Sequence, residues 1–251
     1  MERVDGWWYE ARVVILILGG TSEARALAAA LVDRGDDVLS SLAGRVGDPA
    51  LPAGRVRVGG FGGIAGLTSF LIENRVEAVI DATHPFAAEI SANAAAATAA
   101  TGSPLIRLVR PSWRGRPESG AWTWVDSVGA VLDVAPDAAR PFLTTGRQSL
   151  AVFLPWADRG VVARVVDPPE LDVPPAWTIL RSRGPYALAG ERDLMRRHAV
   201  DLLVTKDSGG TLTEAKLAAA ADLGIPIVVV ARPPSAAGLA TVADVLAALH
   251  P

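Results

Sequence analysis

The fold of this chain is decided by Arg12-Val13-Val14-Ile15-Leu16-Ile17-Leu18-Gly19-Gly20-Thr21-Ser22-Glu23-Ala24-Arg25. Residues 13–18 form an apolar run, which is typical of a strand buried on both faces of a parallel sheet. Two glycines then allow a tight turn, and an alanine-rich helical segment follows. Because such a turn points backbone N–H groups and the positive end of the helix dipole at one place, it suits a phosphate. The stretch therefore predicts a strand, a phosphate-binding turn and a helix.

The turn is an incomplete version of the dinucleotide fingerprint G-x-G-x-x-G/A. Gly19 and Ala24 match its first and third positions, while Thr21 stands in place of the middle glycine. The hydroxyls of Thr21 and Ser22 offer hydrogen bonds to phosphate that glycine lacks. The alternative is a purely structural turn in which Ser22 caps the helix. Cofactor-binding residues are predicted here at Gly19, Gly20, Thr21 and Ser22.

Short apolar runs and longer alanine-rich segments continue to alternate along the chain, which indicates strand-helix units on parallel sheets. A polar segment rich in Pro and Gly, residues 110–120, interrupts the alternation and is predicted to be a surface connection. We therefore expect an α/β fold with two domains, 12–112 for dinucleotide binding and 121–251 for the substrate. Strands are predicted at 12–18, 37–41, 55–58, 77–81, 105–109, 122–125, 141–145, 161–166, 178–181, 201–205 and 226–231. Helices are predicted at 22–34, 64–74, 87–101, 127–135, 187–199, 211–223 and 241–249.

The composition is that of a soluble globular protein, since half of the 251 residues are hydrophobic and a fifth are charged. No apolar run approaches the roughly 18 residues of a membrane span. The N-terminal residues lack the pattern of a secretory signal, so a cytoplasmic location is expected. The net charge of −3 argues against binding to nucleic acid or to an anionic membrane.

The chain contains no cysteine. Disulfides, thiolate metal sites, iron–sulfur clusters and a cysteine nucleophile are therefore excluded together. No metal site is predicted, and redox chemistry requires a bound organic cofactor.

The segment after the second predicted strand bears on the choice of cofactor. About 20 residues beyond the first turn, an NAD-specific site has an acidic residue on the adenosine ribose. Residues 40–45 read Ser-Ser-Leu-Ala-Gly-Arg, with no acid and with Arg45 at the end. A missing acid beside an arginine suits a 2′-phosphate, so NADP is favoured over NAD. Ala43, Gly44 and Arg45 are predicted cofactor residues, the alternative being that Arg45 is an ordinary solvated arginine.

Two further strand ends carry candidate residues. Residues 59–63, Gly-Gly-Phe-Gly-Gly, have a glycine density that implies positive φ angles or backbone lying against a ligand. Residues 81–86, Asp-Ala-Thr-His-Pro-Phe, follow the fourth predicted strand, at the edge where α/β proteins bind ligands. His84 is a functional candidate, the alternative being a turn histidine with satisfied hydrogen bonds. The cofactor residues predicted from these two segments are Gly60, Phe61, Gly62, Thr83 and His84.

The second half places polar and cationic residues beside glycine at three strand ends, 144–148, 181–186 and 205–211. Bidentate arginines suit carboxylates and phosphates, although base composition of the coding sequence also explains an excess of arginine. Only two of the 24 basic residues are lysines, which singles out Lys206 before Ser-Gly-Gly. Its alternative role is a salt bridge with Asp207, whose charge is expected to keep the ammonium protonated. Three such loops can converge on one anionic ligand.

Seven motifs taken together resemble the precorrin-6A reductase family of cobalamin biosynthesis. The resemblance runs in order from about residue 12 to residue 234. It implies NADPH-dependent reduction of a ring double bond in precorrin-6A to give precorrin-6B, by two Rossmann-like domains around an interdomain cleft that holds the active site. The motifs are Gly-Gly-Thr-Ser-Glu-Ala-Arg (19–25), Ala-Gly-Arg (43–45), Gly-Gly-Phe-Gly-Gly (59–63), Asp-Ala-Thr-His-Pro-Phe-Ala (81–87), Thr-Thr-Gly-Arg (144–147), Arg-Gly-Pro-Tyr (183–186) and Lys-Asp-Ser-Gly-Gly (206–210).

The substrate implied by this resemblance is a polycarboxylate tetrapyrrole, which gives the arginines of the second half a purpose. Lys206 and His84 are the predicted catalytic residues, and the proton donor is left open among these two, Tyr186 and water. Substrate-binding residues are predicted at Arg147, Arg183, Tyr186, Lys206, Ser208 and Gly209.

Two other functions remain open from the sequence. A cobalt-precorrin-6A reductase of the anaerobic branch shares every motif. A dinucleotide-sensing module without turnover would instead turn its charged second-domain loops toward a protein partner.

Overall fold

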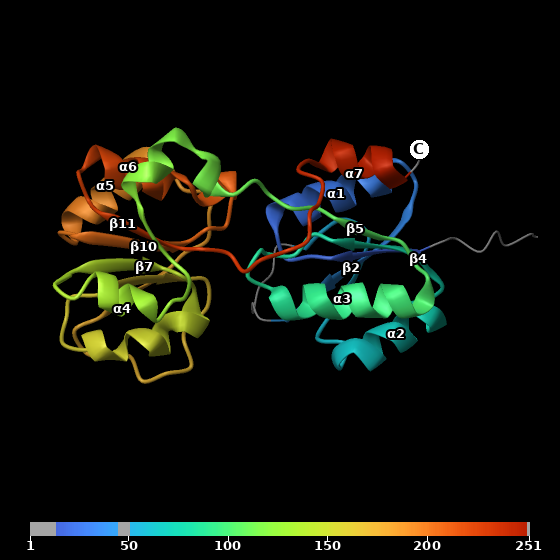
Figure 1. Ribbon diagram of the computed structural model, residues 1–251, viewed down its shortest axis with the longest axis horizontal. Helices are drawn as coiled ribbons and strands as arrows, with labels where there is room; N and C mark the ends of the chain where they lie inside the picture. The colour runs from blue at the N-terminus through green and yellow to red at the C-terminus, as the bar shows by residue number, and fades with distance from the viewer. Residues whose placement is uncertain (1–13, 45–50, 250–251) are drawn as a thin grey trace, which may run out of the picture. The chain divides into compact units, whose positions relative to one another are not determined.

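The computed structural model describes residues 14–44 and 51–249, which form two compact units (Figure 1). The first unit contains the described residues up to Val109 together with those from Ser235 onward, and the second is Arg110–Pro234. The chain thus enters the second unit once and returns once. No helix among the described residues has the length and apolar character needed to cross a bilayer.

The first unit is built on a parallel sheet of five strands in the order β3-β2-β1-β4-β5. Because the chain winds outward from β1 in one direction and then from β4 in the other, the topological switch point lies between these two strands. The strands are β1 (Val14–Leu18), β2 (Asp37–Leu42), β3 (Arg55–Val58), β4 (Val76–Asp81) and β5 (Leu105–Arg107).

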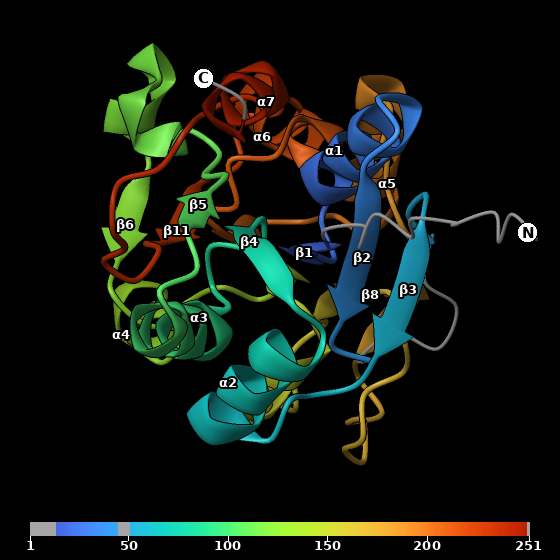
Figure 2. The ribbon, with the colours of Figure 1, turned by 90° about the vertical axis from the view of Figure 1, so that its right-hand side faces the viewer.

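Helices cover both faces of this sheet (Figure 2). Alternate residues of β1 explain why, since Ile15 and Ile17 pack into one apolar cluster while Leu16 and Leu18 pack into the other. The first cluster includes residues of α1 and α7, and the second includes residues of α2 and α3. The helices are α1 (Ser22–Asp33), α2 (Gly63–Glu73), α3 (Ala88–Thr101) and α7 (Val242–Leu249).

The C-terminal segment packs in the first unit, whereas the predicted boundaries placed it in the second domain. Leu239 forms a parallel bridge with Leu108, and the buried Val245 of α7 joins the apolar cluster of α1. The division between the units falls directly after the proline pair Pro233-Pro234, between Pro234 and Ser235. The sequence periodicity of α7 predicts the helix but not the sheet that its apolar side covers.

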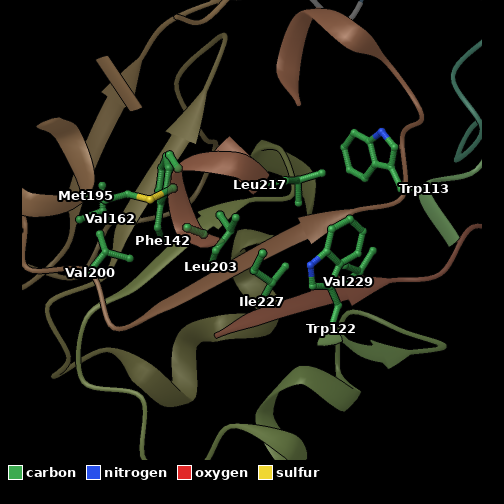
Figure 3. Close-up of a cluster of buried hydrophobic side chains, with 12 residues drawn as sticks. Trp113, Trp122, Phe142, Val162, Met195, Val200, Leu203, Leu217, Ile227 and Val229 are labelled. Atoms are coloured by element: carbon green, nitrogen blue, oxygen red, sulfur yellow. The ribbon is translucent and has the colours of Figure 1, made fainter. Parts of the chain in front are cut away.

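The second unit has a parallel sheet of six strands in the order β6-β11-β10-β7-β8-β9. Its core includes Trp122, Phe142, Leu203 and Val229 (Figure 3). The strands are β6 (Thr123–Val125), β7 (Pro141–Thr144), β8 (Val162–Val165), β9 (Thr178–Arg181), β10 (Leu202–Lys206) and β11 (Ile227–Val230). The α-helices are α4 (Ala130–Val134), α5 (Leu188–Arg197) and α6 (Ala215–Asp222).

The predicted α/β class with parallel sheets flanked by helices is confirmed, and each predicted strand and helix has a counterpart in the structure. Four 3₁₀ segments were not predicted: η1 (Trp113–Gly115), η2 (Pro117–Ala121), η3 (Arg147–Trp156) and η4 (Thr211–Thr213). In η3 a proline at 155 removes a backbone donor, which is incompatible with a regular α-helix at that point.

A buried lysine lies in the second unit, at the start of α6. The Lys216 ammonium donates to the carbonyl of Thr213 at 2.6 Å and lies 5.1 Å from the centre of the Trp113 ring. Burial, reinforced by the Arg164 guanidinium, lowers the pKa of Lys216 to about 7, and Glu191 and Glu214 oppose this only in part. An exposed lysine has a pKa of about 10.4, so folding imposes a large cost on the charged form.

Lys216→Met is therefore expected to change how stability depends on pH. Between about pH 7 and pH 10 the unfolded chain binds more protons at Lys216 than the folded protein, so this group makes stability rise with pH. The unfolding free energy of the wild type minus that of the variant should rise by up to about 1.4 kcal/mol per pH unit. Urea unfolding followed by tryptophan fluorescence measures this difference in unfolding free energy, since every described tryptophan lies in the second unit. A difference that does not change with pH would contradict the prediction.

Candidate functional site

The loops predicted to bind the cofactor meet at the carboxyl edge of the first sheet. Parallel strands end at the same edge, and three backbone hydrogen bonds join the ends of neighbouring strands there. Gly19 N–H donates to Ser41 O at 3.0 Å, Ala82 N–H to Leu18 O at 3.0 Å, and Gly59 N–H to the carbonyl of Leu42 at 2.9 Å. The described candidate residues after β1, β2, β3 and β4 thus share one edge.

The turn after β1 is organised by Thr21. Its hydroxyl accepts from Ala24 N–H at 3.1 Å and donates to Ala82 O at 2.8 Å, so it caps α1 and ties the turn to the end of β4. Thr21 is buried, and the Ser22 hydroxyl donates to the Glu23 carboxylate at 2.9 Å. The prediction that these hydroxyls are available for a phosphate is therefore wrong for Thr21, and the helix cap is Thr21 rather than Ser22.

Glycines leave open space at this edge. Gly20 has a φ of +107°, and a Cβ added there would meet no atom within 4 Å. A Cβ added at Gly59, Gly60 or Gly62, in the loop after β3, would also meet no atom within 4 Å. Together with the leading N–H groups of α1, this glycine-lined backbone fits the pyrophosphate of a dinucleotide.

Arg57 is absent from the residues predicted from sequence, yet it organises the loop after β3. Its Nη1 donates to Ser41 Oγ at 3.0 Å and to Gly59 O at 2.9 Å, and its Nη2 donates to Gly60 O at 3.0 Å. The Phe61 ring lies under the guanidinium, 3.9 Å from its central carbon. Partial burial lowers the pKa of Arg57. The only sequence signal is its place in an edge strand, Arg-Val-Arg-Val, which is shared with Arg55.

The loop after β2 is exposed at Ala43 and Gly44. Gly44 has a φ of +71°, and a Cβ there would lie 3.1 Å from a methyl carbon of Val58, so both the backbone and the neighbouring strand favour glycine. Arg45 lies outside the described residues, and its assignment to the cofactor stays a prediction.

The end of β4 is held by a buried carboxylate. Asp81 accepts from the Thr83 hydroxyl at 2.7 Å and from its N–H at 3.3 Å, and Arg107 lies 3.6 Å away. His84 Nδ1 accepts from Phe86 N–H at 3.3 Å, so a neutral ring carries its proton on Nε2. The Thr83 hydroxyl is already used by Asp81.

The switch point of the second sheet lies between β7 and β10. Arg147, which follows β7, donates to Pro168 O at 3.2 Å and lies 3.7 Å from the well-exposed carboxylate of Glu170. Lys206 ends β10, the neighbouring strand. Arg183 is exposed and follows β9, which is two strands away from β7. The second sheet thus brings Lys206 and Arg147 to adjacent strand ends and leaves Arg183 further out.

Asp207 is held by residues other than Lys206. Its buried carboxylate accepts from Arg232 at 3.0 and 3.1 Å, from the Ser112 hydroxyl at 2.6 Å and from Trp113 N–H at 2.9 Å. Burial also lowers the pKa of Lys206. The expectation that Asp207 keeps the Lys206 ammonium protonated stays a prediction.

The glycine pair after Lys206 has a packing role. Gly209 has a φ of +66°, and a Cβ added there would lie 2.3 Å from the carbonyl oxygen of Pro111. The close backbone approach is thus to the chain itself, while Ser208 N–H closes a turn onto Lys206 O at 2.7 Å. Tyr186 donates its hydroxyl to Ser182 O at 3.0 Å. A contact of Tyr186, Ser208 or Gly209 with the substrate stays a prediction.

Among residues 14–44 and 51–249, no group of three or more His, Asp or Glu side chains is placed to hold a metal ion. The first unit combines the doubly wound strand order with glycine-rich turns at its switch point. This architecture defines an α/β protein of the Rossmann-like class.

Comparison with known proteins identifies the family to which this Rossmann-like chain is similar. Residues 14–250 match the model of the family described as Precorrin-6x reductase CbiJ/CobK. A precorrin-6A reductase of Rhodococcus erythropolis is 50% identical over 94% of this chain and 95% of its own length. A cobalt-precorrin-6A reductase of Priestia megaterium is 34% identical over 88% of this chain and 91% of its own. The solved structure of a CobK precorrin-6A reductase is 41% identical and has a TM-score of 0.88, covering 94% of this chain and 96% of its own.

The chain belongs to the precorrin-6x reductase family. It is therefore a reductase, and the resemblance found from its motifs is confirmed.

Gly209→Ala is expected to destabilise the second unit more than Gly224→Ala. Both glycines have a φ of +66°, so each alanine costs about 1–2 kcal/mol of backbone strain. Only Gly209 meets a backbone atom, whereas a Cβ at Gly224 meets nothing within 4 Å, and overpacking adds about 1–3 kcal/mol. Urea unfolding followed by tryptophan fluorescence compares the two, and equal losses would show that the contact with Pro111 is unimportant.

Proposed function

We propose that this protein reduces a ring double bond of precorrin-6A with NADPH, giving precorrin-6B in cobalamin biosynthesis, and so acts on a CH–CH group. The observation that carries the proposal is the open, glycine-lined edge of a doubly wound sheet in a chain of a reductase family. NADPH, when bound, supplies the hydride. The chain has to bind and orient both molecules and to deliver a proton.

The first unit is assigned to the cofactor. The N–H groups at the start of α1, together with Gly19 and Gly20, are proposed to hold the pyrophosphate. Ala43, Gly44 and Arg45 are assigned to the adenosine end, because the end of β2 is where doubly wound folds contact the ribose. The loop at 59–63 borders the same edge. His84 is proposed to donate its Nε2–H toward the nicotinamide end, which is consistent with the use of Nδ1 by Phe86.

The second unit is assigned to the substrate, a polycarboxylate tetrapyrrole. Arg147 is suited to bind a carboxylate because its ion pair with Glu170 is exposed and so worth at most about 1 kcal/mol. A substrate carboxylate can replace Glu170 at little cost. Arg183 is exposed after β9 and is assigned to a second carboxylate, because a guanidinium suits a carboxylate.

Lys206 is proposed as the proton donor. A donor works best when its pKa is close to the working pH. Burial moves the pKa of Lys206 in that direction, and the neighbouring carboxylate of Asp207 is already occupied by Arg232, Ser112 and Trp113. The alternative role, holding a substrate carboxylate, requires an ammonium that stays charged.

The cobalt-free substrate is favoured over cobalt-precorrin-6A. The precorrin-6A reductase of Rhodococcus erythropolis is 50% identical to this chain, against 34% for the cobalt-precorrin-6A reductase of Priestia megaterium. The difference in identity supports the cobalt-free substrate.

The purified protein is expected to oxidise NADPH when precorrin-6A is added, which is measured as loss of nicotinamide absorbance. The rate with cobalt-precorrin-6A should be lower, and a higher one would reverse the choice between the two substrates. NADPH binding without turnover of either substrate would favour the sensing function instead.

Lys206→Arg is expected to lower kcat by about 10²-fold or more, the usual contribution of general acid catalysis, with little change in KM. Arginine keeps the charge but does not readily release a proton. Steady-state kinetics with precorrin-6A measures the change. Arg196→Lys, on the exposed end of α5, is the control. If Lys206→Arg keeps most of kcat while Lys206→Ala raises KM, the residue holds a carboxylate. Unchanged kinetics in Lys206→Ala would exclude both roles.

A further inference from the structure

We propose that Arg57 binds the 2′-phosphate of NADPH and thereby contributes to the choice of NADPH over NADH. This inference rests on the proposed function, since it deepens the assignment of the first unit to the cofactor. It adds a residue of β3 to the adenosine site, which the sequence motif places only in the loop at 43–45.

The position of Arg57 carries the first part of the argument. Arg57 is the register partner of Ser41, one residue before the end of β2, and its Nη1 donates to Ser41 Oγ at 3.0 Å. In doubly wound folds the carboxyl end of β2 lies beside the adenosine ribose. A guanidinium bound to Ser41 is therefore beside the place where a 2′-phosphate lies.

The charge of Arg57 has no counterion in the part of the chain that the structure describes. Its three acceptors are one hydroxyl and two carbonyls, all neutral, and it forms no ion pair there. Arg55 on the same strand differs, because its Nε and Nη2 donate to the Asp37 carboxylate, each at 3.0 Å. A phosphate would give Arg57 the anionic partner that Arg55 already has.

The geometry of the guanidinium suits that partner. The contacts of Arg57 use both hydrogens of Nη1 and one of Nη2, so Nε–H and the second Nη2–H are without an acceptor among the described residues. Nε and Nη2 are also the two nitrogens with which Arg55 holds Asp37. Two such nitrogens form a fork that binds phosphate oxygens in bidentate fashion.

The guanidinium is also held in place before a ligand arrives. Its central carbon lies 3.9 Å from the centre of the Phe61 ring and 5.2 Å from that of Phe70. The carbonyls of Gly59 and Gly60 fix its other edge. A side chain that is already ordered loses little conformational entropy on binding, which strengthens the contact.

Binding of 2′,5′-ADP and of 5′-AMP tests the inference by calorimetry on the full chain. The two probes differ only in the 2′-phosphate. Arg57→Gln is expected to weaken the binding of 2′,5′-ADP by about 10- to 100-fold, the range for loss of a charge-assisted contact. The affinity for 5′-AMP should change by less than about threefold. Arg55→Gln is the matched control, and it should leave both affinities unchanged.

Three results would overturn the inference. Equal loss of both probes in Arg57→Gln would mean that Arg57 only shapes the loop at 59–63. Unchanged affinity for 2′,5′-ADP in that variant, with a selective loss in Arg45→Ala, would assign the phosphate to Arg45 alone. If the wild type itself binds 2′,5′-ADP no better than 5′-AMP, the proposed use of NADPH fails as well, so the two failures are distinguishable.

A second variant covers the case in which glutamine disturbs the loop. Arg57→Lys keeps the charge and loses the fork. It should bind 2′,5′-ADP with an affinity between those of the wild type and Arg57→Gln, at an unchanged affinity for 5′-AMP. A lysine variant that weakens both probes alike would again reduce Arg57 to a structural role.

Discussion

The first unit depends on the parallel pairing of β1 with β2 on one side and with β4 on the other. This pairing brings the ends of separate segments to one edge, where the backbone bonds of Gly19, Ala82 and Gly59 link neighbouring strands. The hydroxyl of Thr21 adds a link between the turn after β1 and the end of β4. Because the edge is fixed by backbone and by buried groups, its glycines can remain open toward a ligand.

The second unit also joins distant segments at the ends of its strands, but through a buried carboxylate. Asp207 binds both segments through which the chain enters and leaves this unit, since Ser112 and Trp113 belong to the first and Arg232 to the second. Lys206 is the neighbour of that anchor along β10. The carboxylate next to Lys206 thus stabilises the fold by binding both segments.

The strands and helices were predictable because their apolar periodicity is a local property of the sequence. Site features that depend on distant residues were not. Arg57 has no signal that separates it from Arg55, because what distinguishes them is the partner that each meets across the sheet. The close approach of Gly209 to Pro111 could not be predicted, since the two residues are nearly a hundred positions apart in the chain. The packing of α7 in the first unit depends equally on a contact far from it in sequence.

We propose that this chain transfers a hydride directly from NADPH to a tetrapyrrole ring. A single-turnover reaction with NADPH carrying two deuterium atoms at C4 of the nicotinamide tests this transfer most directly, whichever face donates. The reduced tetrapyrrole, examined by mass spectrometry, is expected to contain one deuterium from the cofactor. A product with no deuterium from the cofactor would contradict direct transfer. So would a reaction of unlabelled NADPH in deuterated water whose product takes up two deuterium atoms.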